Sequence, residues 1–145
     1  MKPTDLALNQ ALRISDAPPD APHLLELAFT SLVRNHIGTV HAAAQFALAE
    51  AAAAERLRRD FIALAEEIVP IMRGAEVKYR QPATGDLRAY AALDEAARVQ
   101  IPADLAASGR TLASVTVELK DNAGILTFAG KFYWFLIRRD KFGTT

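Results

Sequence analysis

The chain of 145 residues has seventeen basic and seventeen acidic side chains, and it contains no cysteine. This neutral balance gives no electrostatic basis for binding nucleic acid or an anionic membrane surface. Disulfides, zinc–thiolate sites and cysteine nucleophiles are excluded, and the three histidines lack the helical spacing of a zinc-binding HExxH motif. We therefore expect one globular domain without a metal. Because no apolar targeting segment begins the chain, we also expect a cytoplasmic protein.

The first half of the chain is predicted to hold one long helix after a short lead-in. Residues 3–15 are expected to form a short helix, which the prolines within residues 17–22 end. We assign residues 1–22 to an N-terminal helix and proline-rich lead-in, and residues 23–142 to a single domain. In residues 24–33 apolar side chains alternate, which favours a strand, although a helix also fits. A turn at residues 35–39 leads into a helix over about residues 40–65.

The second half is predicted to be mainly strand. Side chains alternate in residues 75–79, 87–93, 111–120 and 125–138, and hairpins at residues 81–86 and 121–124 would join neighbouring strands. Residues 94–107 form a loop or a short helix that Pro102 interrupts. This order predicts an α+β domain in which an antiparallel sheet wraps around one long central helix. The other sheet face would expose Phe132 and Trp134 or their alternates, which is typical of a surface that a partner subunit buries.

A single carboxylate, Glu50, lies on the apolar side of the predicted helix. At about 100° per residue, this side also carries Ala43, Phe46, Ala47, Ala54, Leu57 and Phe61. The other side carries His41, Gln45, Glu55, Arg56 and Arg59. An acid among apolar neighbours costs free energy unless it is paired, protonated or placed in a wet cavity. Glu50 is therefore the first candidate for a functional group, the alternative being an acid that reaches solvent or pairs with an arginine at an interface.

Residues 35–50 run from a glycine-containing loop into this alanine-rich helix. The spacing of Asn35, Gly38, His41 and Glu50 resembles the loop-and-helix signature of the phenylacetyl-CoA-type acyl-CoA thioesterases, which have the hotdog fold. In that family an Asn precedes a Gly-containing turn, a His-Gly-Gly opens the central helix, and an acid follows at the separation that Glu50 has from His41. Residues 79–86 are similar to the strand–Pro–Gly turn of the same families. The resemblance implies a hotdog fold for this chain.

The resemblance also implies a hydrolase of acyl-CoA or a related thioester, with no cofactor. Glu50 would act as nucleophile or general base, with its pKa raised by apolar surroundings. Asn35 would orient Glu50 or the attacking water, unless it is only a turn residue. His41 would fix the loop or contact the substrate. Hotdog sites form between two subunits, so a homodimer or tetramer is expected.

Further substrate contacts are implied at the loop and at the helix start. Gly38 and Thr39 belong to the loop, and the amides near Ala42 and Ala43 would polarise the thioester carbonyl. Basic residues on the strands, Lys78 and Arg80 among them, could bind the phosphates of coenzyme A, or could simply form a solvated face. These assignments complete the expected substrate-binding set.

Two departures from the family pattern favour a different class of protein. Ala42 and Ala43 replace the two glycines after His41, and no hydroxyl side chain occurs between Glu50 and Tyr79. A non-catalytic hotdog module that binds acyl thioesters, or that only dimerises, is therefore the alternative. A hotdog dehydratase acting on hydroxyacyl thioesters is a weaker alternative, because the chain lacks the Phe-Pro-Gly-type loop usual in those enzymes.

Overall fold

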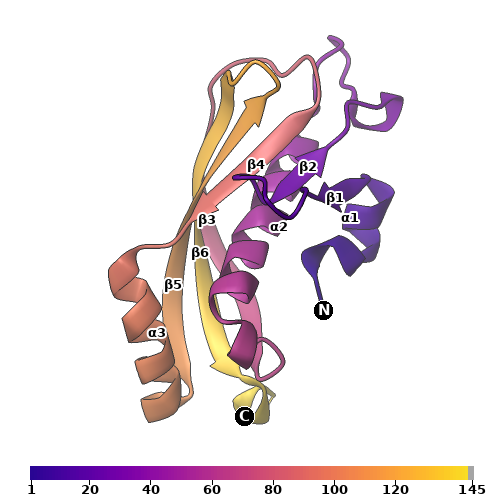
Figure 1. The fold of residues 1–145 in the computed structure, drawn as a ribbon. Coiled ribbons are helices and arrows are strands. Elements are labelled where there is room, and N and C mark those ends of the chain that lie inside the picture. Colours follow the sequence, from indigo (N-terminus) through magenta and orange to yellow (C-terminus); the bar gives the residue numbers. More distant parts are fainter. Residues whose placement is uncertain (144–145) are drawn as a thin grey trace.

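Residues 1–143 are described by a computed structural model, in which six antiparallel strands form one sheet around a central helix (Figure 1). The strands are β1 (Ile14–Asp16), β2 (Leu25–Leu27), β3 (Ile68–Tyr79), β4 (Leu87–Ala92), β5 (Arg110–Asp121) and β6 (Leu126–Arg138). They lie in the order β1-β2-β4-β5-β6-β3. The α-helices are α1 (Ala7–Ala11), α2 (Ala42–Asp60) and α3 (Glu95–Ser108). Short 3₁₀ helices are η1 (Pro3–Asp5), η2 (Ser31–Val33), η3 (Ile62–Leu64) and η4 (Arg139–Lys141).

The core lies between α2 and one face of the sheet. Phe132 of β6 packs its ring against Phe46 of α2, with 5.4 Å between the ring centroids. Trp134 is buried two residues further along β6 and shares that face, because strand side chains alternate. The expected α+β architecture, an antiparallel sheet wrapped around one long helix, is therefore confirmed. Phe132 and Trp134 belong to the core, while their alternates Tyr133 and Phe135 are only half-buried.

Several element boundaries differ from the predicted ones. Residues 3–15 form η1 and α1 and then enter the sheet as β1, because Arg13 turns the chain with φ of 60°. Residues 24–33 supply only the short strand β2 and the turn η2. The helix α3 continues through Pro102 and ends where Gly109 has φ of 77°. Burial of Ile101 and Leu105 accounts for its persistence, since packing outweighs local propensity in most protein helices.

The predicted hairpin at residues 81–86 is wrong. β3 pairs with β6, from Ile68 opposite Arg138 to Tyr79 opposite Phe128, whereas β4 lies between β2 and β5. Alternation shows which side chains share a face of a strand, but it does not identify the neighbouring strand. Within residues 1–143, β3 is an edge strand with one unpaired side.

The buried side of α2 also differs from the predicted one. Gln45 and Glu55, expected on the solvent side, are 4% and 1% exposed, whereas Ala43 is exposed. Arg58 donates to both carboxylate oxygens of Glu55, at 2.8 and 2.9 Å. In this alanine-rich helix, alanines lie around the whole circumference. The sequence therefore does not define a single buried side.

Candidate active site at the central helix

Asn35 shapes the loop that precedes α2. Its Oδ1 accepts hydrogen bonds from the amides of Ile37 (3.1 Å) and Thr39 (2.9 Å), and its Nδ2 donates to Thr39 Oγ1 (2.7 Å). Gly38 has φ of 79°, a left-handed conformation that glycine adopts without steric cost. Both polar atoms of Asn35 therefore hold the loop, and in this structure neither contacts Glu50.

His41 caps the N-terminus of α2. Its Nδ1 accepts a hydrogen bond from the amide of Ala43 at 3.0 Å. The amide of Ala42 has no hydrogen-bond partner among the described residues, and Ala42 is exposed. Two amides were expected to polarise a carbonyl. The amide of Ala42 is a free donor, whereas the amide of Ala43 already donates to His41. The positive end of the helix dipole adds to the attraction of this helix start for negative charge.

The end of β3 lies beside the helix start. The hydroxyl of Tyr79 donates to the carbonyl of Ala42 at 2.9 Å. Lys78 and Arg80 are exposed on either side of Tyr79, and neither forms an ion pair within residues 1–143. Because strand side chains alternate, Lys78 projects from the face of β3 opposite to Tyr79. Tyr79 was not among the predicted site residues, and its position at the end of a strand was the only signal in the sequence.

A buried polar pair lies between the helix start and β6. The hydroxyl of Thr127 donates to Oε1 of Gln45 at 3.1 Å, and both side chains are almost completely buried. Neither residue was predicted to be near the site. The helical wheel placed Gln45 on the solvent side, and Thr127 is far from it in sequence. This pair supplies a hydroxyl next to α2, although it does not line the pocket described below.

Glu50 lies two turns further along α2, about 12 Å from Ala42 at the rise of an α-helix. It is half-buried, and its carboxylate makes no hydrogen bond or ion pair with any described residue. Burial raises the pKa of this carboxyl above its ordinary value of 4.5. An unpaired carboxyl with a raised pKa is a typical proton acceptor in an active site, although structural groups also show such shifts.

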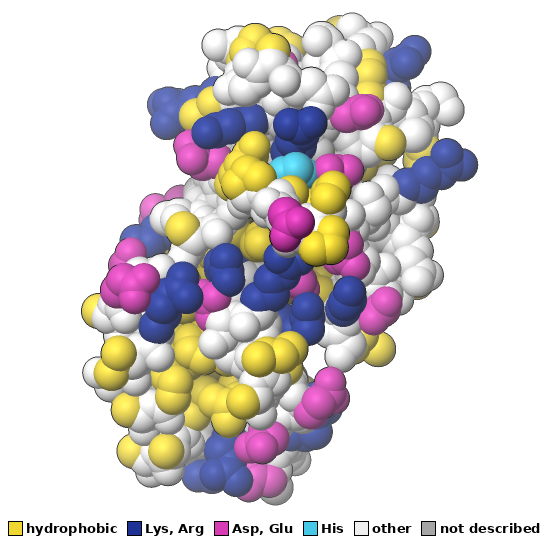
Figure 2. All heavy atoms as spheres, in the orientation of Figure 1, with side chains coloured by type: hydrophobic (Ala, Val, Ile, Leu, Met, Phe, Trp, Pro, Cys, Tyr) yellow, Lys and Arg dark blue, Asp and Glu magenta, His cyan; other side chains and the backbone are white. Residues whose placement is uncertain are grey.

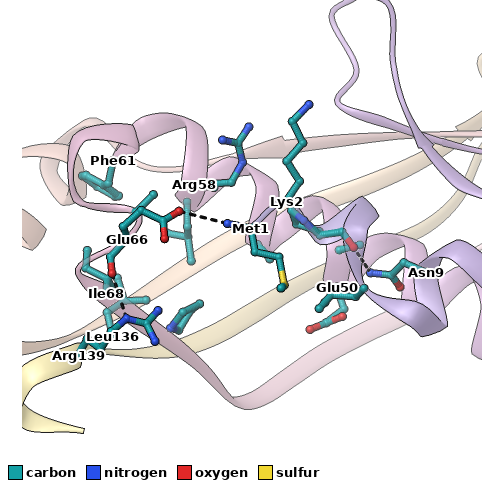
Figure 3. A pocket seen from close by; sticks show the side chains of 17 residues that line it. Met1, Lys2, Asn9, Glu50, Arg58, Phe61, Glu66, Ile68, Leu136 and Arg139 are labelled. Carbon is teal, nitrogen blue, oxygen red and sulfur yellow. Dashed lines mark hydrogen bonds and ion pairs between the residues drawn. The ribbon is translucent and has the colours of Figure 1, made fainter.

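Glu50 lies at one end of a pocket of about 570 Å³. The pocket is bounded by α2, the start of β3, the end of β6 and the N-terminal segment that includes Met1 and Asn9 (Figure 3). Its lining within the described residues includes no serine, threonine or tyrosine, and Asn35 and His41 are not part of it. The structure therefore divides the predicted site residues into two groups, one at the helix start and one, Glu50 alone, in the pocket.

Charges on the surface are mixed. On the face seen in Figure 2, basic and acidic side chains are intermingled, and hydrophobic side chains gather over its lower part, where Figure 1 places α3 and β5. The described residues contain no group of three or more histidine, aspartate and glutamate side chains that could hold a metal ion. No helix within residues 1–143 has the length and hydropathy needed to cross a membrane.

Comparisons with known proteins fit this architecture. The family described as a domain of unknown function (DUF4442) matches residues 13–136. A Pseudomonas aeruginosa protein of unknown function, described as a probable thioesterase, is 23% identical, with TM-score 0.74 over 93% of this chain and 89% of that one. A thioesterase from Haemophilus influenzae is 12% identical, with TM-score 0.72 over 93% and 85%. A Bacillus halodurans protein solved with CoA is 18% identical, with TM-score 0.69 over 90% and 75%. No curated protein matches the sequence.

These similarities establish the fold and leave the chemistry open. The six-stranded antiparallel sheet around α2 matches the solved thioesterase structures, so the expected hotdog fold is confirmed. At identities below 25%, the similarity shows a shared fold and does not carry the activity of those proteins to this chain. The candidate site residues of this chain remain predictions.

Proposed function

The chain belongs to the DUF4442 family, and we propose that it hydrolyses acyl-CoA thioesters as a hotdog enzyme of the phenylacetyl-CoA-type branch. One observation carries the proposal: the unpaired, half-buried carboxylate of Glu50 opens into a pocket beside the central helix of a hotdog fold. The CoA bound to the Bacillus halodurans protein supports the same class of ligand.

In the proposed reaction Glu50 removes a proton from a water molecule. The water oxygen attacks the thioester carbonyl carbon, and the carbon–sulfur bond then breaks. Glu50 returns its proton to the departing sulfur, so the products are a carboxylic acid and the thiol of CoA, and the carboxylate of Glu50 is regenerated. A free backbone amide at a helix N-terminus can stabilise the oxyanion that forms during this attack. In this chain the amide of Ala42 is such a donor.

Glu50 and Ala42 of one chain do not act on the same carbonyl in this proposal. They are separated by about 12 Å along α2, which is more than the side chain of Glu50 can span. A second copy related by a two-fold axis would bring its own helix start to Glu50, and each copy would complete the site of the other. The unpaired side of β3 is a surface on which such a copy could add.

The test is release of free thiol from a panel of acyl-CoAs by the wild-type protein and by Glu50→Gln. Loss of a general base lowers turnover by about 10²–10⁴-fold, so we expect a loss of this size in Glu50→Gln. Glu118→Gln, a change at an exposed position on β5, is the matched control and should keep full activity. Equal turnover in the wild type and Glu50→Gln would overturn the role of Glu50.

A non-catalytic module that binds acyl thioesters is the second candidate. It is favoured by the occupied amide of Ala43 and by the absence of a hydroxyl side chain from the described lining of the Glu50 pocket. The same assay separates the two functions. A rise in melting temperature with CoA, without thiol release from any substrate, would identify the binding module.

A further inference from the structure

The pocket beside Glu50 extends along α2, and its inner wall is apolar. This wall is formed by Ala51, Ala54, Leu57, Phe61, Pro70 and Leu136. From Glu50 to Phe61 the helix rises about 16 Å. A phenylacetyl group would occupy only the part of this pocket nearest to Glu50. The alanines of α2 keep the pocket open, because larger side chains at these positions would fill it.

The outer wall is the N-terminal segment, residues 1–9. Pro3 is buried, and the buried side chain of Asn9 donates from Nδ2 to the carbonyl of Pro3 at 2.9 Å. Lys2 pairs with Asp16 at 3.0 Å and its side chain points away from the pocket (Figure 3). This segment precedes residue 13, where the match to the family begins. One wall of the pocket therefore consists of residues outside the matched domain.

Two cations that line the pocket, Lys2 and Arg58, already have partners. Lys2 is bound to Asp16, and Arg58 donates to both oxygens of the buried carboxylate of Glu55. Neither is therefore available to neutralise a negatively charged acyl tail in this part of the pocket. The carboxylate of Glu50 would itself repel such a tail. Arg139 lines only the far end of the pocket, where its Nε donates to the carbonyl of Glu66 at 3.0 Å. The apolar lining between these two ends favours an uncharged aliphatic group.

We propose that this pocket binds the unbranched aliphatic chain of a medium-chain acyl thioester, with its carbonyl at Glu50 and its methyl end towards Phe61. An extended chain of about ten to twelve carbons matches the rise of about 16 Å along α2 from Glu50 to Phe61. The proposal rests on the proposed function, because it assigns the acyl group of the same thioester.

The test is the dependence of kcat/KM on acyl length, from acetyl-CoA to palmitoyl-CoA. Each buried methylene contributes about 0.8 kcal/mol, or about fourfold. We expect kcat/KM to rise by up to this factor per carbon, to a maximum at about ten to twelve carbons, the length derived from the helical rise. Wild-type kcat/KM that is as high with acetyl-CoA and phenylacetyl-CoA as with decanoyl-CoA would overturn the inference and leave the proposed function standing.

Ala54→Leu tests the position of the chain. Ala54 is about 6 Å past Glu50 along the helix, so a leucine there should block the pocket and move the maximum to about five or six carbons. Ala47→Leu is the matched control, because Ala47 is also half-buried on α2 but does not line the pocket. An unchanged length profile in Ala54→Leu, or an equal shift in both variants, would contradict the inference.

If no thiol is released, binding measurements separate the aliphatic-pocket proposal from the hydrolase proposal. The measurement is calorimetric titration with non-hydrolysable alkyl-CoA thioethers. Affinity that rises with alkyl length, with a negative heat-capacity change, and that falls in Ala54→Leu would keep the aliphatic pocket while the hydrolase proposal fails. Affinity independent of alkyl length would overturn the aliphatic pocket.

Discussion

The cost of keeping Glu50 ionised can be measured through the stability of Glu50→Gln. Burial raises the pKa of Glu50 in the folded chain, so the folded state binds the proton more tightly than the unfolded state. The stabilisation from this proton is complete below the ordinary pKa of 4.5, and it is lost as pH rises through the raised pKa of the folded state. At neutral pH the ionised carboxylate is therefore a net cost, which glutamine removes.

The size of this effect follows from the surroundings of Glu50. A polar group buried without a partner costs about 1–3 kcal/mol, and the half-buried position of Glu50 sets the lower end of this range. We expect Glu50→Gln to be more stable than the wild type by about 1 kcal/mol at pH 7.5, which raises Tm by about 2–4 °C for a chain of this size.

Thermal unfolding followed by circular dichroism at pH 4 and pH 7.5 checks this expectation. The gain in Tm should be present at pH 7.5 and should shrink at pH 4, where the wild-type carboxyl is protonated. Glu118→Gln, at an exposed position, should change Tm little at either pH. A lower Tm for Glu50→Gln at pH 7.5, or a gain that does not depend on pH, would refute the reasoning that Glu50 is unpaired and strained by burial.

Three other changes test the surroundings of the site. Glu55→Gln should lower stability by about 3 kcal/mol, because it removes the charge that pairs with Arg58 and Arg59, and urea unfolding would measure the loss. Burial alone would raise the pKa of Glu55, but the hydrogen bonds and charges of its arginine partners outweigh burial, so the pKa is lowered. The wild type should therefore lose the stabilisation from these pairs only as pH falls through the lowered pKa. Asn35→Ala should cost about 1–2 kcal/mol through its lost loop hydrogen bonds, and hydrogen exchange of the loop should increase; unchanged exchange would contradict that role. Gly130→Ala should lower Tm, because its Cβ would lie 3.0 Å from side-chain atoms of Phe132 and Val77; an unchanged Tm would show that these side chains move aside.

The sequence predicted the architecture well because the decisive patterns are local. Alternation in β5 and β6 and the long alanine-rich helix α2 each appear in a short window, and together they allow few arrangements. Strand partners were not predictable in this way. β3 pairs with β6 across the whole second half of the chain, and no residue near positions 81–86 indicates that the chain leaves β3 for the far side of β5.

The candidate site was only partly predictable for a related reason. The spacing of Asn35, His41 and Glu50 identified the loop and the helix, and the raised pKa of Glu50 agrees with the expectation from its apolar neighbours. Which side of an alanine-rich helix faces the sheet depends on tertiary packing, so the burial of Gln45 and Glu55 was missed. The pocket was also missed, because one of its walls is the N-terminal segment, far from Glu50 in sequence.

The pairing of β3 with β6 has a consequence for how this chain folds. Ile68 pairs with Arg138, and β4, α3 and β5 lie between them in the sequence, so this contact closes a long loop. Such non-local pairing slows folding, because loop-closure entropy is lost before the contacts form. Until β6 is in place, β3 has neither edge paired, and its backbone is open to strands of other molecules. The edge proposed to receive a second copy in the folded protein is thus also where early misassociation during folding would begin.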